Sequence, residues 1–307
     1  MKTQGSLLIA LAALLWATDA LYRLPAAQGL DPTWIVFWEH AVAVLILFPW
    51  AFLAHRKSFL RLSRREWASA AVVGLGGSAA ATTLFTSAFQ FLNPSVVILL
   101  QKMQPVVVVI LAFAFLGERP AKAFYGWGAV ALASCGVLSF ERWDDVGLGA
   151  GSLGFGHARG VVSSLAAAFI WAVSTVAGKV LLHRTPLAVA TFWRFAFGLT
   201  GLGLTLAFRQ LQDPGQLIPW NIMVQPEMIR ALLYLSLVPG VLAMVAYYAG
   251  LGRAPASVVT IVELIFPVTA VLINWAFLGT PLQTFQWVAG AVLVLAVSRI
   301  PPPALRT

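Results

Sequence analysis

The sequence predicts an all-α integral membrane protein in which ten transmembrane helices form two inverted repeats of five. Three observations lead to this prediction. Hydrophobic residues make up 60% of the 307 residues and charged residues only 10%, whereas a soluble domain carries roughly 25% charged residues to solvate its surface. The hydrophobic residues gather in ten long runs, and the two halves of the chain resemble each other. Lipid is therefore the solvent that suits this surface.

Each apolar run is close to the roughly 20 residues that a helix needs to cross the hydrocarbon of a bilayer. Such runs are expected to be helical, because a helix satisfies every backbone polar group within its own segment. The ten runs cover residues 5–22, 34–54, 67–89, 94–116, 122–140, 160–181, 187–208, 229–250, 256–278 and 283–299.

Lysine and arginine in the loops predict the orientation, because cytoplasmic loops carry the excess of positive charge. The side with the N-terminus carries twelve: Lys2, Arg56, Lys57, Arg61, Arg64, Arg65, Arg119, Lys122, Arg184, Arg253, Arg299 and Arg306. The opposite side carries five: Arg23, Arg142, Arg159, Arg209 and Arg230. We therefore expect a multi-pass protein of a cell (inner) membrane with both termini in the cytoplasm.

A Gly-rich stretch divides the chain into halves of similar length. The expected organisation is a first repeat at residues 1–141, a linker at 142–158 and a second repeat at 159–307. A shift of 155 residues places Trp16 on Trp171, and a shift of 162 residues later in each half places Pro105 on Pro267. The two shifts differ by loop lengths, as expected of diverged copies.

An odd number of helices in each half has a mechanical consequence. The second copy must enter the membrane upside down relative to the first, and inverted repeats recur in secondary transporters, whose substrate site lies near the midplane between the halves. The repeat therefore favours alternating access. The alternative is a duplication that serves stability alone.

Several motifs of both halves resemble the EamA-type repeat of the drug/metabolite transporter superfamily, and the resemblance covers nearly the whole chain. It implies a transporter fold, but it does not specify the solute, since members move amino acids, nucleotide sugars and other metabolites. The motifs in the first half are Leu15-Trp16-Ala17, Asn93-Pro94-Ser95, Gln104-Pro105 and Leu116-Gly117-Glu118; those in the second are Ile170-Trp171-Ala172, Trp193-Arg194-Phe195, Phe266-Pro267 and Leu278-Gly279.

The first half departs from this pattern in its charges. The arginine common in the second helix of such repeats is present as Arg194, but the 155-residue shift pairs it with Glu39. The first-helix lysine is present as Lys179, whereas the first half has Leu24 there with Arg23 beside it. These changes are candidates for substrate-specific features.

Ionisable side chains at bilayer depth are costly, so each is a functional hypothesis. The candidates are Asp19, Glu39, Lys102, Lys179, Arg194 and Glu263. We expect two ion pairs, Glu39–Lys102 and Arg194–Glu263, each holding a gate or binding one end of a zwitterion. The alternative is a pair of structural contacts without a role in transport, because buried pairs frequently fix geometry without adding affinity.

Two further groups lie close to these charges. Asp19 and Tyr22 are one helical turn apart and share a face, so they could line a vestibule or face the headgroups. His40, beside Glu39, titrates near neutral pH when unperturbed, which makes it a candidate proton relay. The alternative is a solvated histidine near the interface.

Polar and aromatic residues are expected to complete a central cavity. Tryptophan and tyrosine offer flat faces for an organic solute or a cation, although tryptophan also forms interfacial belts and polar side chains also join helices. The candidates are Trp16, Gln90, Gln101, Trp171, Ser174, Trp193 and Tyr247.

Other classes of function lack support in the sequence. The basic residues sit between apolar runs and not on one polar face, which excludes a nucleic-acid partner. A single cysteine, Cys135, allows no cysteine-based metal site, and we expect no metal and no cofactor. No phosphate-binding loop or hydrolase motif is found.

The sequence therefore predicts a secondary transporter that exports a small metabolite such as an amino acid, with lipid and solute as its partners. Downhill flux, exchange and proton coupling through Glu39, Asp19 or Glu263 stay open, as do a monomer and a homodimer. A membrane-embedded enzyme acting on a lipid-soluble substrate is the alternative, and a receptor or scaffold would bind a ligand without moving it.

Overall fold

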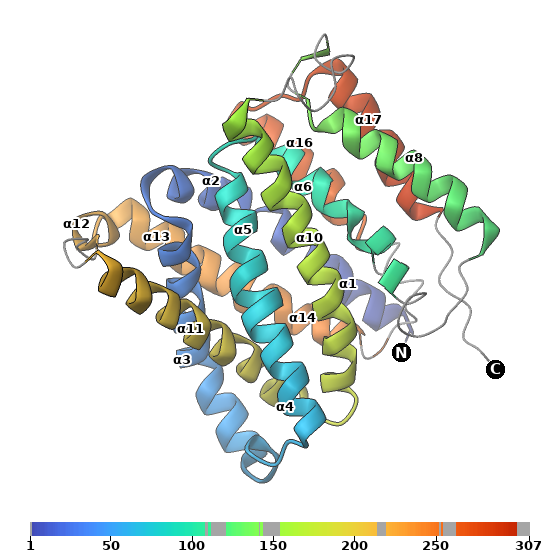
Figure 1. The fold of residues 1–307 in the computed structure, drawn as a ribbon. Coiled ribbons are helices and arrows are strands. Elements are labelled where there is room, and N and C mark those ends of the chain that lie inside the picture. The colour runs from blue at the N-terminus through green and yellow to red at the C-terminus, as the bar shows by residue number, and fades with distance from the viewer. Residues whose placement is uncertain are drawn as a thin grey trace.

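The computed structural model is a bundle of helices (Figure 1) and describes residues 2–107, 110–111, 121–140, 142–143, 154–213, 219–251, 253 and 262–299. Every regular element in these ranges is helical. The first half contains α1 (Lys2–Ala17), α2 (Ala20–Gly29), α3 (Pro32–Phe59), α4 (Arg64–Ala71), η1 (Val72–Ala80), α5 (Ala81–Ala88), α6 (Pro94–Leu100), η2 (Gln101–Met103) and α8 (Lys122–Leu138).

The second half is also helical. It contains α10 (Phe155–Leu182), α11 (Leu187–Gln212), α12 (Trp220–Met223), α13 (Pro226–Leu235), η4 (Ser236–Leu242), α14 (Ala243–Leu251), α16 (Ile265–Leu278) and α17 (Thr284–Ser298). The segments η1 and η4 are π-helical and η2 is a 3₁₀ turn. The Leu278-Gly279 motif ends α16, because Gly279 adopts a φ of 59° that favours glycine.

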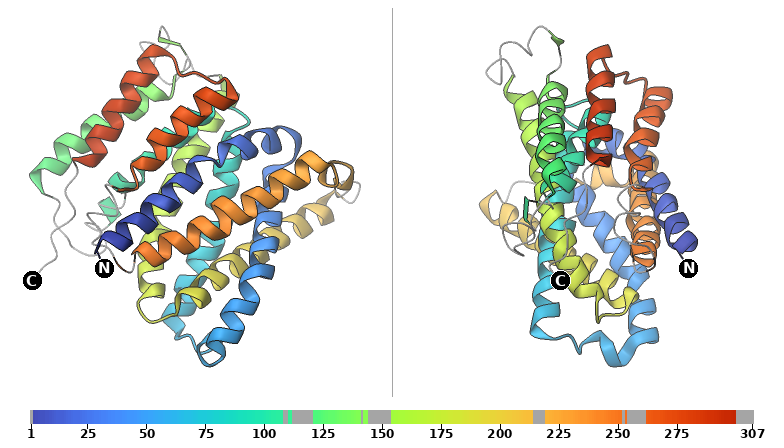
Figure 2. Two further views of the ribbon diagram at one scale, coloured as in Figure 1. Left: turned by 180° about the vertical axis from the view of Figure 1, so that it is seen from behind. Right: turned by 90° about the vertical axis from the view of Figure 1, so that its right-hand side faces the viewer.

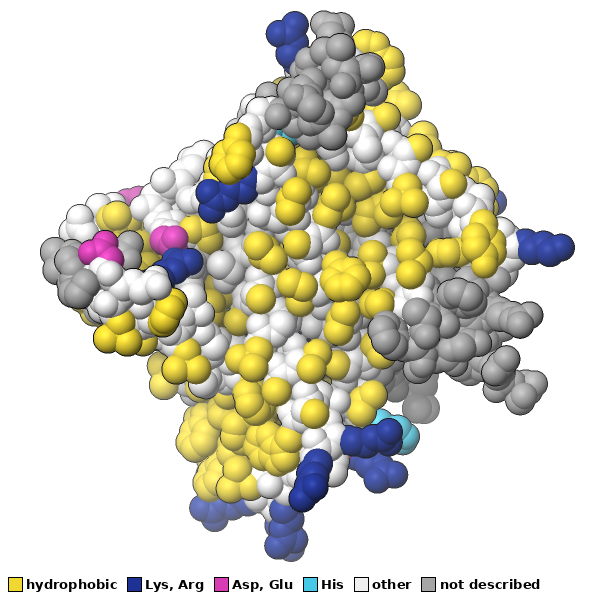
Figure 3. Space-filling model, viewed as in Figure 1, with side chains coloured by type: hydrophobic (Ala, Val, Ile, Leu, Met, Phe, Trp, Pro, Cys, Tyr) yellow, Lys and Arg dark blue, Asp and Glu magenta, His cyan; other side chains and the backbone are white. Residues whose placement is uncertain are grey.

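Within the described ranges, six helical segments are long and apolar enough to cross a membrane: Gln4–Gly29, Pro32–Phe59, Arg64–Ala88, Phe155–Leu182, Leu187–Gln212 and Pro226–Gly250. Lys122–Leu138, Ile265–Leu278 and Thr284–Ser298 are shorter apolar helices. Hydrophobic side chains cover much of the face in Figure 3, and Lys and Arg gather at its margins. The prediction of an all-helical membrane protein is confirmed for the described residues, whereas ten crossings and an inverted repeat stay predictions.

The first span is longer than the predicted run at 5–22. Helix α2 continues to Gly29, and α3 begins directly afterwards at Pro32, where the Asp31 side chain accepts a 2.8 Å hydrogen bond from the Thr33 backbone N–H. This corrects the placement of Arg23 in a loop. Arg23 is only 3% exposed and lies inside the bundle.

Helices from the two halves interleave, as the two views in Figure 2 show. Helix α1 packs on α14 and α16 of the second half, and α10 packs on η1, α5 and α6 of the first. The second helices, α3 and α11, contact each other, as do the last helices, α8 and α17. Each half therefore buries the other half's apolar faces, and neither forms a separate core.

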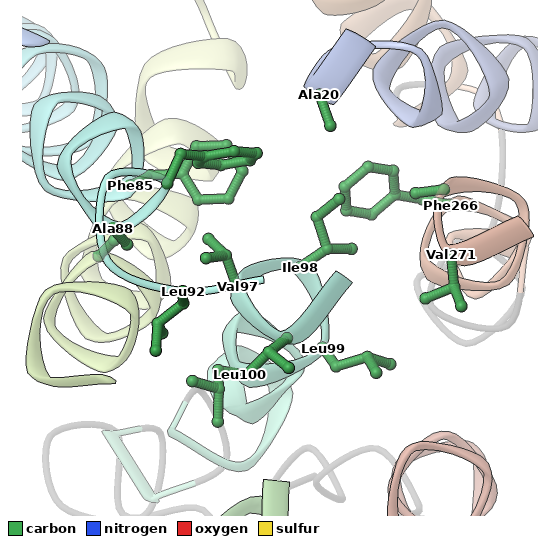
Figure 4. Close-up of a cluster of buried hydrophobic side chains, with 14 of the residues drawn as sticks. Ala20, Phe85, Ala88, Leu92, Val97, Ile98, Leu99, Leu100, Phe266 and Val271 are labelled. Atoms are coloured by element: carbon green, nitrogen blue, oxygen red, sulfur yellow. The ribbon is translucent and has the colours of Figure 1, made fainter. Parts of the chain in front are cut away.

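Helix α6 lies at the centre of the largest apolar cluster. Figure 4 shows its side chains between Phe85 of α5 and Phe266 of α16, with Ile98 directed towards Phe266. The Asn93-Pro94-Ser95 motif starts this helix, because the Asn93 side chain accepts a 2.9 Å hydrogen bond from the Ser95 N–H. The motif thus orients α6 between the two halves.

Gly74 of η1 allows a close approach to α11. A Cβ atom there would lie 2.4 Å from the Phe197 Cβ and 2.7 Å from the Arg194 carbonyl oxygen. We expect Gly74→Ala to lower the free energy of unfolding by about 1–3 kcal/mol, because overpacking forces helices apart. Reversible unfolding in detergent micelles measures this.

Gly126→Ala is the matched control, since no atom lies within 4 Å of the added Cβ on the exposed face of α8. Alanine favours a helix over glycine by up to about 1 kcal/mol. Equal stability of the two variants would contradict the close packing of η1 on α11.

Candidate functional site

A cavity of about 230 Å³ lies between the two halves. Its walls carry three acidic side chains, Asp19, Glu39 and Glu263, and three basic ones, Arg23, Lys102 and Arg194. Aromatic rings of Phe85, Phe266 and Tyr248 share the walls with Trp16, Trp171 and Tyr247. A chamber with this many ionisable groups inside an apolar bundle is typical of a solute pathway.

Most of the candidate residues meet at this cavity although they come from both halves. The lining includes Trp16, Asp19, Glu39, His40, Gln101, Lys102, Trp171, Ser174, Arg194, Tyr247 and Glu263. Lys179 lies on α10, but its side chain is outside the described part of the chain.

Tyr22, Gln90 and Trp193 lie apart from the cavity lining and have structural contacts. Tyr22 stacks on Tyr234 with ring centroids 4.0 Å apart. The Gln90 amide donates a 2.8 Å hydrogen bond to the Ala27 carbonyl. The Trp193 indole donates a 2.9 Å hydrogen bond to the Phe59 carbonyl. These contacts join helices.

Arg23 is the functional-site residue that the sequence reasoning missed. Its guanidinium donates two hydrogen bonds to Asp19, at 2.5 and 2.8 Å, and two to Glu39, at 2.9 and 3.2 Å. A fifth, at 2.7 Å, reaches the Thr86 hydroxyl. All five N–H donors of the side chain are therefore engaged, and α2, α3 and α5 are tied together at one end of the cavity.

The ion pairs differ from those expected. Glu39 lies against Arg23 and not Lys102, so the predicted Glu39–Lys102 pair is wrong. The Lys102 ammonium lies 4.6 Å from the centre of the Phe266 ring and is attracted by Glu263. Helix rotation, which loop charges and spacing do not reveal, decides these partners. The predicted Arg194–Glu263 pair stays a prediction, and both residues line the cavity.

Two helices are interrupted shortly before a proline. Lys102 lies three residues before Pro105, and Glu263 lies four residues before Pro267. Proline lacks an N–H, so Pro105 and Pro267 cannot donate to the carbonyls of Gln101 and Glu263 four residues earlier. The residue before each proline donates instead. The Gln104 N–H donates to the Gln101 carbonyl, and the Phe266 N–H donates to the Glu263 carbonyl at 3.1 Å. Both turns tighten to an i to i+3 pattern, which often marks a functional hinge.

His40 is buried and bridges α3 to η1. Its Nδ1 lies 2.7 Å from the Val36 carbonyl oxygen, which only accepts, so Nδ1 carries a proton. Its Nε2 lies 2.8 Å from the Ser78 hydroxyl. At 2% exposure His40 is not the solvated histidine of the alternative interpretation. Both ring nitrogens are engaged, so these contacts fix the orientation of the ring.

Two tryptophans join the halves reciprocally. The Trp16 indole donates a 3.0 Å hydrogen bond to the Pro239 carbonyl in η4, and the Trp171 indole donates a 2.7 Å hydrogen bond to the Gly77 carbonyl in η1. The 155-residue shift relates the two donors, and the 162-residue shift relates the two acceptors. π-Helical segments are frequent at functional sites, and here both supply acceptors beside the cavity.

We expect Trp16→Phe and Trp171→Phe to have similar effects. Each leaves one carbonyl in the bundle without its donor and lowers the free energy of unfolding by about 1–3 kcal/mol. Thermal unfolding of the purified variants measures this. Trp275→Phe is the control, because the Trp275 side chain is 57% exposed. A large effect at only one of the two positions would contradict equivalent roles.

A polar chamber enclosed by apolar helices defines a membrane transporter, and comparison with known proteins identifies its family. Residues 3–140 and 158–300 match the EamA-like transporter family. The chain belongs to this family, as its motifs indicated. The membrane-embedded enzyme is set aside, because the family and the similar proteins are transporters.

The similar proteins cover almost the whole chain. The riboflavin transporter ImpX of Fusobacterium nucleatum is 26% identical over 306 residues, 97% of each chain. An uncharacterized transporter of Archaeoglobus fulgidus is 27% identical over 310 residues, again 97% of each. A solved crystal structure, 22% identical, matches with a TM-score of 0.64 over 97% of this chain and 96% of its own. That likeness shows the fold alone.

Proposed function

We propose that this protein is a secondary transporter that carries a small organic solute through the central cavity by alternating access. The observation that carries the proposal is a cavity shared by both halves whose walls combine ionisable groups with aromatic rings. Charged groups hold the polar part of a solute and aromatic rings hold a flat part.

The mechanism requires ten crossings arranged as two inverted repeats, with residues 1–141 and 159–307 as the repeats and 142–158 as the linker. Reciprocal tryptophan contacts and reciprocal packing of α1 and α10 support a two-fold relation between the halves. Rocking about that axis would expose the cavity to either side in turn. The helix interruptions at Gln101–Met103 and Glu263–Leu264 are the proposed hinges.

For the solute we propose an amino acid or a similar small metabolite that is exported from the cytoplasm. The balanced acidic and basic side chains suit a zwitterion. Riboflavin, which the printed name of one relative gives as that protein's solute, is the second candidate, because the aromatic walls suit a flat ring. Location in the cell (inner) membrane, cytoplasmic termini, proton coupling and a monomeric or homodimeric state belong to the same proposal.

The test is flux in proteoliposomes that contain only this protein. Vesicles are loaded with labelled aromatic, acidic or basic amino acids or with riboflavin, and efflux is followed with and without a pH gradient. Saturable movement of an unmodified solute supports the proposal. Binding without flux for every solute would contradict it and would favour a receptor. Chemical cross-linking in the vesicles reports the oligomeric state.

A further inference from the structure

We propose that Arg194 binds the carboxylate of the transported solute at the cavity wall, where its buried Nε has no hydrogen-bond partner among the described residues. The proposal rests on the transport function above and names its substrate class. Four observations carry it: the sequence relation between two clusters, the contacts of Arg194, the space beside it and the chemistry of a guanidinium.

The first observation compares equivalent positions. The 155-residue shift relates Glu39 to Arg194 and Arg23 to Gly178, and the 162-residue shift relates Thr86 to Tyr248. The first half therefore places a base, an acid and a hydroxyl where the second half places a glycine, a base and a hydroxyl. The acidic Glu39 of the first half is therefore replaced by the basic Arg194, and its partner Arg23 is replaced by Gly178.

The second observation is the incomplete coordination of Arg194. Its Nη1 donates a 3.1 Å hydrogen bond to the hydroxyl of Tyr248, the counterpart of Thr86, which accepts from Arg23 in the first half. Its Nε atom is buried and has no hydrogen-bond partner among the described residues. A buried donor without an acceptor is unfavourable, so an anionic ligand that supplies the acceptor is stabilised there.

The third observation is the open space at Gly178. A Cβ atom at this position would meet only the Tyr248 hydroxyl oxygen, at 3.8 Å, and a Val73 methyl group, at 4.0 Å. These are ordinary contact distances. Gly178, Arg194 and Tyr248 all line the cavity. A small side chain therefore fits at Gly178, next to the Tyr248 hydroxyl that Arg194 contacts.

The fourth step is chemical. A guanidinium binds a carboxylate through two parallel N–H···O bonds, which gives both affinity and orientation. Tyr248 supplies a hydroxyl next to the same site. A small solute with a carboxylate suits this site, and a neutral amide of the same shape brings no negative charge to Arg194.

The experiment measures binding of matched acids and amides by isothermal titration. The probes are L-phenylalanine, L-glutamate and indole-3-acetate, each compared with its carboxamide. We expect at least one acid to bind ten-fold or more tightly than its amide, and Arg194→Gln to remove that preference. Arg209→Gln is the control, because Arg209 lies on the same helix, exposed, and pairs with Asp31 at 3.3 Å.

A second pair of variants tests the site without removing Arg194. Gly178→Asp supplies an internal carboxylate beside Arg194, so it should weaken binding of the acid ten-fold or more. Gly178→Ala adds a methyl group without a charge at ordinary contact distances, so it should weaken acid binding less than Gly178→Asp does. These variants keep the test decisive if Arg194→Gln fails to fold.

Two results would overturn the inference: no acid binds more tightly than its amide, or the preference persists in Arg194→Gln or Gly178→Asp. Saturable flux of riboflavin in either case would leave the proposed transport function intact. Failure of all flux, with acid binding lost in Arg194→Gln, would contradict transport and leave the carboxylate site standing.

Discussion

Arg23→Gln will lower the free energy of unfolding by about 3–5 kcal/mol, because it leaves Asp19 and Glu39 buried without their counter-charge. Arg23 donates to both carboxylates, and its side chain is 4% exposed. Asp19 and Glu39 are 7% and 5% exposed, so little water can replace the guanidinium. Chemical unfolding of the purified variant in detergent micelles measures the loss.

Variants of the two carboxylates test whether uncompensated charge causes the loss of stability in Arg23→Gln. Replacing all three residues together, as Asp19→Asn, Arg23→Gln and Glu39→Gln, should restore most of the stability, since no charge is then buried. Arg209→Gln should cost less than about 1 kcal/mol, because the Arg209–Asp31 pair is about half exposed. If the triple variant is as unstable as Arg23→Gln, uncompensated charge is not the reason.

Lys102→Met will reduce transport about 30-fold or more while the protein stays folded. The change removes a cation from the cavity wall, 4.6 Å from the centre of the Phe266 ring, and a hydrogen bond from a charged group to the solute contributes about 2 kcal/mol. The cavity would then hold three acidic and two basic groups. Initial rates of counterflow in proteoliposomes measure the effect.

Lys102→Arg keeps the charge and should retain a large part of the activity. Lys57→Met is the matched control, because it removes an exposed lysine near the end of α3. Normal counterflow by Lys102→Met at normal protein content would show that the cation has no part in transport.

The helical architecture could be predicted because lipid imposes a strong constraint on sequence: long apolar runs have few alternatives to helices. The C-terminal end of the first membrane span could not be predicted in this way. Arg23 looks like a loop residue in a count of positive charges, and only its spacing of four residues from Asp19 suggested a partner on the same helix face. Two carboxylates, from different helices, make its burial possible.

The candidate site was predictable in composition and less so in pairing. Ionisable residues in apolar runs point inwards because lipid disfavours them, and Glu39, Lys102 and Arg194 do line the cavity. Which acid meets which base depends on how each helix is rotated. Gln90 and Trp193 were also predicted to bind solute, but both donate to backbone carbonyls. The sequence does not distinguish a polar side chain that binds the backbone from one that binds solute.

Access of one cavity position from the two sides of the membrane tests alternating access most directly. Cys135 is the only cysteine of the chain, so Cys135→Ala gives a background for a single probe, Thr82→Cys, on the cavity wall. A membrane-impermeant maleimide should label this cysteine when applied to either side, and a transported solute should slow both reactions. Labelling from one side alone under every condition would contradict a cavity that opens in turn to both.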